Sequence, residues 1–401
     1  MGIFNKADIY LPAESVDLTK WSVIACDQYT SQPEYWERVE KNVGDAPSTL
    51  KIIFPEVYLD EGEGRISEIN RKMREYLDSG VLKSYKNSIF YIERTQRDGR
   101  IRKGIIGAVD LEEYDFSKDS KSLIRATEGT VLERIPPRVS IRKNALLELP
   151  HINLLVDDPE DNLITKPESA ELLYDFELME NGGHLKGYRL SDDDADLLVD
   201  KIDSMAKTAK GNLLFAVGDG NHSLATAKTC WEMIKSGLSE EEKSSHPARF
   251  CLVEIENIHS DALDFEPIHR VVFGTQPEKL IEEMESFYPE LSREDNGGLH
   301  ISYIFEGGNG DIYIKNSGTM LAVGALQKFL DSKNLKIDYI HGDDAAKTLG
   351  EKPGNIAFLL PKPQKNEFFE TIISDGVLPR KTFSMGEADD KRFYMESKKI
   401  K

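Results

Sequence analysis

The sequence predicts a mixed protein of α/β to α+β class, with mixed sheets and helices packed together. Three observations favour this class. The chain has 401 residues, too many for one ordinary core, which predicts two or three domains. Its composition, 39% hydrophobic and 30% charged, is that of a soluble globular protein. Short apolar runs typical of strands are interspersed with segments of helical spacing.

The first 160 residues contain clear helix and turn signals. Pro33 in a first turn favours a helix over 32–43, Ser79-Gly80 ends a helix over 66–77, and the Asp98-Gly99 turn joins strands at 87–94 and 102–109. Two prolines at 136–137 interrupt any longer helix, so the next helix is expected over 139–148. Apolar runs predict further strands at 21–26 and 151–157.

The remaining elements follow from the same signals. Ser191 and three aspartates mark the start of a helix over 191–207, and the other predicted helices cover 224–235, 278–287, 326–331, 343–349 and 367–375. The predicted strands are 172–178, 186–190, 213–217, 248–255, 299–305, 311–316, 319–323, 337–341 and 355–360. Polar stretches at 158–170 and 274–299 suggest an N-terminal α+β domain at 1–160, a central domain at 161–275 and a C-terminal α+β domain at 276–401.

Charge and cysteine usage exclude several classes of function. The formal charge of −20 disfavours general affinity for nucleic acid or anionic membranes, although a local pocket for a small anion remains compatible with it. The chain has no apolar run of about 18 residues and no N-terminal signal core, so we expect a cytoplasmic protein without membrane spans. Three scattered cysteines form neither a disulfide framework nor a CxxC metal site.

The most informative stretch is the strand, glycine loop and helix over 213–235. Gly218 and Gly220 allow a left-handed or closely approached backbone, and Asn221 or Ser223 is expected to cap the helix. A helix start attracts anions through its N–H groups and partial positive charge. Asp219 and His222 add a carboxylate and an imidazole at the same place.

Basic residues that could bind an anion gather in three other segments. Arg125 and Arg138 lie in the basic stretch 122–151, together with Glu128; a solvated basic face is an equal alternative there. For His269-Arg270, spacing alone favours a core-edge histidine beside a surface arginine over an anion site. For Lys381-Thr382, a solvated pair is favoured over a phosphate contact.

Several common catalytic patterns are absent from the sequence. It contains no GxxxxGK[ST] loop, no complete GxGxxG fingerprint, no HExxH and no GxSxG elbow. The scattered histidines make a structural metal site a poor expectation. The surviving hypothesis is a carboxylate acting on a hydroxyl, with Asp219 or Glu128 as general base and cationic side chains holding phosphate oxygens.

Five stretches, taken together, resemble one known family. They are WSVIACDQYTSQPEYW, IRATEGTVLERIPPR, GDGNHSLATA, PIHR and PRKTF, and they are similar to successive motifs of the domain of unknown function 1015. That family is sometimes labelled ParB- or SpoOJ-like, because its usual loop, Asp-Gly-His-His-Arg, is similar to the Gly-x-His-Arg loop of the ParB and sulfiredoxin superfamily. The resemblance implies a ParB/sulfiredoxin-like core plus an additional α+β portion. The superfamily includes nucleotide-binding enzymes and a free-serine kinase, whose loop and following helix hold nucleotide phosphates.

The resemblance carries over to individual residues of this chain. Asp219, Gly220 and His222 match the family loop, whereas Asn221 replaces its first histidine and Ser223 stands where the superfamily has arginine. Glu128 and Thr130 match a His-Glu-x-Thr motif, with Thr127 in place of the histidine.

The first functional hypothesis is a small-molecule enzyme, a nucleotide-dependent kinase or phosphotransferase using ATP or ADP with Mg²⁺. The second is a non-catalytic metabolite or nucleotide sensor, and the third is a ParB-like DNA-binding protein. The catalytic candidates are Asp219, Glu128 and His222. The ligand-binding candidates are Gly218, Gly220, Asn221, Ser223, Arg125, Thr130, Arg138, His269, Arg270, Lys381 and Thr382. No metal-ligating residue is assigned, and the oligomeric state is open.

Overall fold

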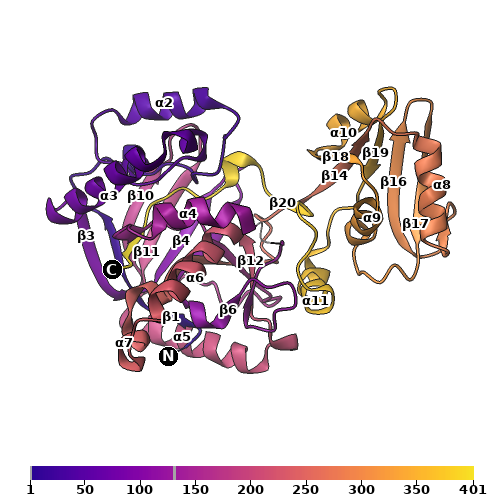
Figure 1. The fold of residues 1–401 in the computed structure, drawn as a ribbon. Coiled ribbons are helices and arrows are strands. Elements are labelled where there is room, and N and C mark those ends of the chain that lie inside the picture. The colour runs from indigo at the N-terminus through magenta and orange to yellow at the C-terminus, as the bar shows by residue number, and fades with distance from the viewer. Residues whose placement is uncertain (1, 130–131) are drawn as a thin grey trace. The chain divides into compact units, whose positions relative to one another are not determined.

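The computed structural model describes residues 2–129 and 132–401 and has an α+β fold with mixed sheets (Figure 1). Contacts divide the described chain into two compact units. Unit 1 comprises the described residues of Met1–Ala126, Thr130–Leu263 and Glu387–Lys401, and unit 2 comprises Thr127–Gly129 and Asp264–Gly386. Most of unit 2 is therefore inserted in sequence between two parts of unit 1. The division into three domains at residues 160 and 275 stays a prediction.

A large mixed sheet forms the centre of unit 1. Its strands are, in spatial order, β10 (Glu171–Glu177), β11 (His184–Arg189), β4 (Phe90–Thr95), β5 (Ile101–Asp110), β13 (Phe250–Asn257), β9 (Asn153–Val156), β12 (Phe215–Asp219), β7 (Ile124–Arg125) and β6 (Tyr114–Asp115), with β1 (Phe4–Asn5) also paired to β5. β9 runs parallel to β13 and antiparallel to β12, so Asn153 lies opposite both Glu254 and Asp219.

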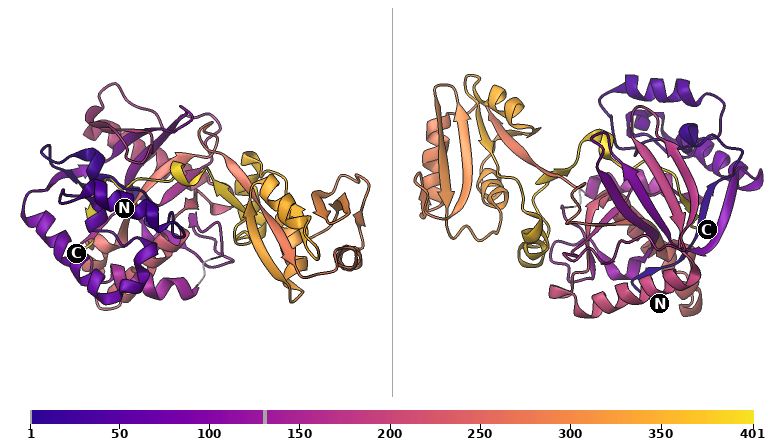
Figure 2. Two further views of the ribbon diagram at one scale, coloured as in Figure 1. Left: turned by 90° about the horizontal axis from the view of Figure 1, so that it is seen from above. Right: turned by 180° about the vertical axis from the view of Figure 1, so that it is seen from behind.

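A second, smaller sheet of unit 1 joins the two ends of the chain. Its strands are, in order, β3 (Leu82–Ser88), β2 (Ala7–Pro12), β21 (Ser397–Lys399) and β8 (Leu147–Glu148). Figure 2 shows the end of the chain beside the indigo strands of its beginning. The last segment, residues 387–401, is therefore an integral part of unit 1.

Helices cover both faces of the large sheet, which separates two cores. The helices of unit 1 are α1 (Leu18–Trp21), α2 (Pro33–Val43), α3 (Gly62–Asp78), α4 (Ile135–Arg142), α5 (Asp192–Thr208), α6 (Asn221–Lys235) and α7 (Glu240–Ser245). Trp21 and Trp36 are buried in one core with α2 and α3, whereas Trp231 is buried in the other with α5 and α6. These buried aromatic side chains contribute several kcal/mol each to stability, about 3–5 kcal/mol by truncation to alanine.

Unit 2 is built on its own sheet. The strands are, in order, β15 (Leu291–Ser292), β17 (Gly308–Ile314), β16 (Leu299–Phe305), β19 (Ile356–Leu359), β14 (Phe265–Phe273) and β18 (Lys336–His341), with β20 (Phe383–Met385) paired to the start of β14. Apolar residues of α8 (Pro277–Phe287) and α9 (Ala322–Asp331) share one core with this sheet. The remaining helices are α10 (Asp343–Gly350) and α11 (Lys365–Asp375).

Three predicted elements were wrong in type or in bounds. The strand at 21–26 does not form: Trp21 ends α1, which the Asp17 side chain caps by accepting the N–H groups of Thr19 and Lys20, and Ile24 pairs only in an isolated bridge with Phe393. The helix expected at 139–148 is α4, with prolines in its first turn, where a missing N–H costs little. The strand expected at 319–323 overlaps the start of α9.

Among the described residues, every helix is too short or too polar to span a bilayer. The cytoplasmic location stays a prediction.

Candidate functional site

The glycine loop joins β12 to α6 through one left-handed residue. Gly220 has φ +80°, and a Cβ atom at that position would lie 3.0 Å from Ile152 Cα. Gly220 is also the N-cap of α6, and no side chain caps this helix. The expected cap by Asn221 or Ser223 was wrong, because the helix begins one residue earlier than such a cap requires. The first N–H groups of a helix have no acceptor within the helix, which favours an anion there.

Asp219 is the last residue of β12 and is held as a carboxylate beside the loop. Its oxygens accept hydrogen bonds from the Gly220 N–H at 2.8 Å and lie 3.1 Å from Lys391 Nζ. Burial raises the pKa of Asp219, but the charges of Lys391 and His151 outweigh it, so its pKa lies below the ordinary value. A quarter of the Asp219 side chain is exposed, which leaves the ionised group within reach of solvent.

His151 lies next to this carboxylate, in the segment before β9. It is 6% exposed, its Nδ1 lies 2.7 Å from the Tyr394 hydroxyl, and its Nε2 lies 3.2 Å from Ser223 Oγ. Asp27 Oδ2 lies 3.8 Å from the same Nε2. The imidazole therefore connects the first turn of α6 to the C-terminal segment of unit 1.

Tyr394 fixes the other side of this histidine. Its oxygen accepts a hydrogen bond from the Cys26 N–H at 3.2 Å, and its hydroxyl is hydrogen bonded to the Cys26 thiol. Burial raises the pKa of Tyr394 well above its ordinary value and that of Cys26 to about 12. Both groups are therefore neutral at physiological pH and act as fixed dipoles.

A buried ionic cluster lies on β13, next to Asn153. Arg392 is paired with Glu254 and with Glu396, and Arg102 Nε lies 3.0 Å from Glu256 Oε1. Burial and the neighbouring Glu254 hold the pKa of Glu256 well above its ordinary value. This cluster ties β13 to the segment that also carries Lys391 and Tyr394.

Two predicted arginines of unit 1 bind groups of the protein itself. Arg125, 3% exposed, donates to the carbonyls of Ser122 and Asn212 at 2.9 and 3.1 Å. Arg138 is paired with Glu56 and donates to the Arg134 carbonyl. Their role as anion ligands stays a prediction.

The predicted residues of unit 2 form a separate arrangement. Arg270 is fully buried and donates to the carbonyls of Ile268, Lys381 and Arg380. His269 Nδ1 accepts the Leu360 N–H at 3.1 Å, and its Nε2 donates to Asp343 at 2.9 Å.

The other predicted residues of unit 2 stay close to Arg270. Thr382 donates to the Pro379 carbonyl at 2.6 Å, and Glu128 acts on Arg270 electrostatically. Burial lowers the pKa of Arg270 to about 10, which leaves it charged at neutral pH.

The structure thus brings together some predicted residues and adds others. Gly218, Asp219, Gly220, Asn221, His222 and Ser223 share the β12–α6 loop of unit 1, whereas Glu128, His269, Arg270, Lys381 and Thr382 belong to unit 2. Thr130 lies outside the described residues. A single cleft formed by all of them stays a prediction. Sequence reasoning missed the site roles of His151, Lys391 and Tyr394, which are distant in sequence and match no motif.

The described residues contain no group of three or more His, Cys, Asp or Glu side chains that could hold a metal ion. A Mg²⁺ ion bound mainly by substrate phosphates needs only one or two protein carboxylates. Asp219, whose side chain is one quarter exposed, could supply one such carboxylate.

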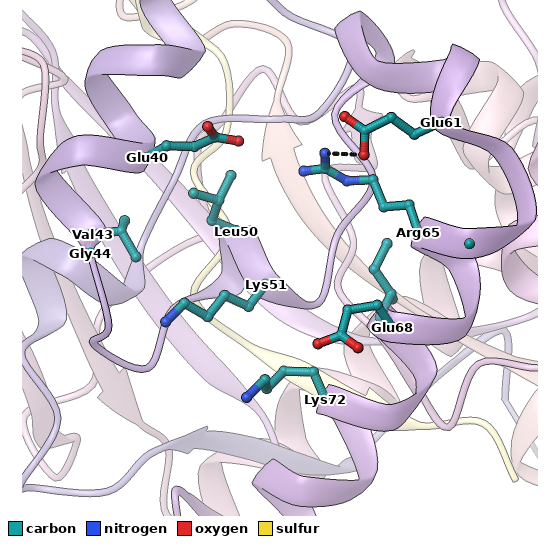
Figure 3. Close-up of a pocket in the computed structure, with 11 residues that line it drawn as sticks. Glu40, Val43, Gly44, Leu50, Lys51, Glu61, Arg65, Glu68 and Lys72 are labelled. Carbon is teal, nitrogen blue, oxygen red and sulfur yellow. Dashed lines mark hydrogen bonds and ion pairs between the residues drawn. The ribbon is translucent and has the colours of Figure 1, made fainter.

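A cavity of about 640 Å³ lies elsewhere in unit 1, between α2 and α3 (Figure 3). Its walls carry charges of both signs, including Lys51, Arg65 and Glu68. Burial and the neighbouring Lys72 lower the pKa of Lys51. None of the sequence-predicted site residues lines this cavity.

Comparisons with known proteins give a family but no activity. The family model described as "Protein of unknown function (DUF1015)" matches residues 7–376, and no curated protein matches the chain. Similar solved structures include truncated SbnI from Staphylococcus aureus, with a TM-score of 0.37 and 12% identity over 70% of this chain and 82% of that one. A mutant free serine kinase in complex with ADP has a TM-score of 0.40 and 12% identity over 75% of this chain and 93% of that one.

A conserved hypothetical protein from Pyrococcus furiosus has a TM-score of 0.36 and 13% identity over 74% of this chain and 95% of that one. Likenesses at these scores assign no ligand to this chain. The predicted ParB and sulfiredoxin likeness stays a prediction.

Proposed function

The chain belongs to the DUF1015 family, and from its own residues we propose that it is a small-molecule enzyme. The enzyme would bind a phosphate-bearing ligand, a nucleotide, at the start of α6 and transfer a phosphoryl group. The observation that carries this proposal is the ionised Asp219, paired with Lys391 and placed directly before the uncapped start of α6.

The start of α6 supplies the anion-binding part. Its first N–H groups and the helix dipole favour a phosphate, and Gly220 provides the left-handed turn, at φ +80°, that leads from β12 into the helix. Lys391 adds a positive charge near the loop and offsets the charge of Asp219. A small pocket of this kind is compatible with the overall charge of −20.

Asp219 supplies the catalytic part. In phosphoryl transfer the protein mainly positions its reactants, and a carboxylate accepts the proton of the attacking hydroxyl late in the reaction. A lowered pKa keeps Asp219 ionised at neutral pH, which suits a group that orients a hydroxyl or binds Mg²⁺. Mg²⁺ would arrive with the nucleotide and neutralise charge on the phosphates.

A non-catalytic nucleotide sensor is the second candidate. The observation in its favour is the same ion pair, because a carboxylate held by Lys391 at 3.1 Å is a poorer proton acceptor than an isolated one. DNA binding is the weakest candidate, since a net charge of −20 opposes contact with phosphate backbones.

The direct test is a thermal-shift series with AMP, ADP and ATP, each with and without Mg²⁺. A nucleotide concentration of about 100 times Kd stabilises the folded state by about 2.7 kcal/mol. We expect this to raise the melting temperature of the wild-type chain by several degrees. Asp219→Asn should lose this response, and Asp193→Asn, an exposed aspartate at the start of α5, should keep it. A flat wild-type response to all nucleotides would remove the proposal.

Enzyme and sensor are separated by turnover. Release of ADP from ATP that depends on an added hydroxyl-bearing metabolite favours the enzyme. Saturable nucleotide binding without ADP release over a panel of such metabolites favours the sensor.

A further inference from the structure

The hydrogen bond between Ser223 and His151 is not used by the function proposed above. We infer that Ser223 is a nucleophile that receives the phosphoryl group as a covalent ester, with His151 as its general base. This inference rests on the proposed phosphate site at the start of α6. It adds a phosphoserine intermediate, so transfer would occur in two steps.

The positions of the two groups fit attack by the serine. Ser223 is the third residue of α6 and is half-buried, and its Oγ lies 3.2 Å from Nε2 of the nearly buried His151. A nucleophile is recognised by a base within about 2.6–3.2 Å that is itself oriented by a third group. Tyr394, 2.7 Å from Nδ1, is that third group.

The role of a base requires one particular tautomer of His151. The Tyr394 oxygen accepts the Cys26 N–H at 3.2 Å and has a second lone pair within reach of His151 Nδ1 at 2.7 Å. In the tautomer that the inference requires, the imidazole donates its Nδ1–H to that lone pair. Nε2 is left as an acceptor directed at the Ser223 hydroxyl.

Two carboxylates lie near the imidazole that would receive the serine proton. Asp27 Oδ2 lies 3.8 Å from Nε2, and Asp219 interacts with His151 electrostatically. Both carboxylates stabilise the imidazolium that forms during attack. A phosphoryl group on Ser223 would in turn lie in the first turn of α6, where negative charge is stabilising.

The proposed step balances as follows. Ser223 Oγ forms a bond to the terminal phosphorus of a nucleoside triphosphate, the bond from that phosphorus to the bridging oxygen breaks, and the nucleoside diphosphate leaves with the bonding electrons. The serine proton passes to His151 Nε2. In the second step an acceptor hydroxyl attacks the phosphorus and passes its proton to the Asp219 carboxylate, while Ser223 Oγ leaves and recovers its proton from His151 Nε2.

The test uses an electrophile with the same tetrahedral phosphorus, an alkyl phosphonofluoridate, on the full chain. Its P–F bond breaks, fluoride and a proton leave, and one phosphonyl group remains on the attacking oxygen. We expect a single adduct in the intact mass, mapped by peptide sequencing to Ser223. Ser223→Ala should abolish that adduct, while Ser236→Ala, an exposed serine after the same helix, should leave it unchanged.

The role of His151 is tested by the rate of modification. His151→Asn should slow adduct formation about 100-fold or more, the usual contribution of a general base. Absence of the Ser223 adduct from the wild-type chain, or an unchanged rate in a folded His151→Asn variant, would overturn the inference. Mapping the wild-type adduct needs no variant, so misfolding of a mutant leaves the test intact.

The two proposals fail separately. A nucleotide thermal shift without a Ser223 adduct would leave the phosphate site standing and remove the covalent step. A Ser223 adduct without any nucleotide response would show that the serine is activated. It would contradict nucleotide binding at this site, and therefore also the phosphoserine intermediate.

Discussion

His151 in unit 1 and His269 in unit 2 are both nearly buried and both lie beside carboxylates, yet their second nitrogens differ. His269 Nδ1 accepts a backbone N–H from Leu360, so its Nε2 carries the proton and donates it to Asp343. His151 has a hydroxyl at each nitrogen, from Tyr394 and Ser223. A backbone partner fixes His269 as a structural group. His151, in contrast, can exchange protons with Ser223, a side chain that is half-buried.

The cations near each histidine show the same difference. Arg270 directs its guanidinium at three carbonyls of its own unit and is fully buried. Lys391 directs its amine at Asp219, a quarter of which is exposed. Residue type alone therefore does not distinguish a structural cation from one that belongs to a site; the distinction lies in what accepts its hydrogen bonds.

The largest effect should come from removing the buried guanidinium of unit 2. Arg270→Met leaves the carbonyls of Ile268, Arg380 and Lys381 without this donor, at a cost of about 3 kcal/mol or more. Chemical denaturation measures the loss. Arg380→Met, at an exposed position, should change stability by less than about 0.5 kcal/mol. Equal effects of the two substitutions would contradict a structural role for Arg270.

A smaller effect is expected at the left-handed glycine of unit 1. Gly220→Ala imposes strain at φ +80° and brings a Cβ atom to 3.0 Å from Ile152, at about 1–3 kcal/mol. Because Ile152 follows His151, the rate of Ser223 modification should fall along with the melting temperature. Gly237→Ala is the matched control, since a Cβ atom at Gly237 would lie 3.8 Å from the Ile234 carbonyl oxygen, an ordinary van der Waals contact. Unchanged stability and rate in Gly220→Ala would show that the loop relaxes freely.

The smallest effect concerns the ion pair at Asp219. Its folded-state pKa is lowered, so the pair contributes stability above the unfolded pKa and loses it as pH falls through the folded pKa. Lys391→Met should therefore cost about 1 kcal/mol near neutral pH and nothing well below pH ~4. Denaturation at several pH values measures this difference, with Lys207→Met as the exposed control. A difference that does not depend on pH would assign the loss to packing.

Elements with local signals could be predicted from the sequence. The helix expected over 191–207 is Asp192–Thr208, because Ser191 accepts the Asp194 N–H and three aspartates follow in the first turn. The strand, glycine loop and helix around Asp219 also form as predicted. The start of α4 shows the limit, since a proline pair reads equally well as a break or as a first turn.

The partners of the candidate site could not be predicted in this way. His151 meets Ser223 72 positions away and Tyr394 243 positions away, and neither spacing corresponds to a local motif. These contacts depend on which strands pair, on the bulge before Asp219 and on the path of the last segment. Sequence reasoning could place the loop but not the residues that surround it.

The order of the chain has a consequence for biosynthesis. Segment 387–401, which supplies β21, Lys391 and Tyr394 to unit 1, follows unit 2 in sequence. A ribosome therefore releases all of unit 2 before the strand that sits between β2 and β8 becomes available. Until then the nascent chain carries an open sheet edge, so the earlier part of unit 1 depends on its last segment to close that edge and complete the network around His151.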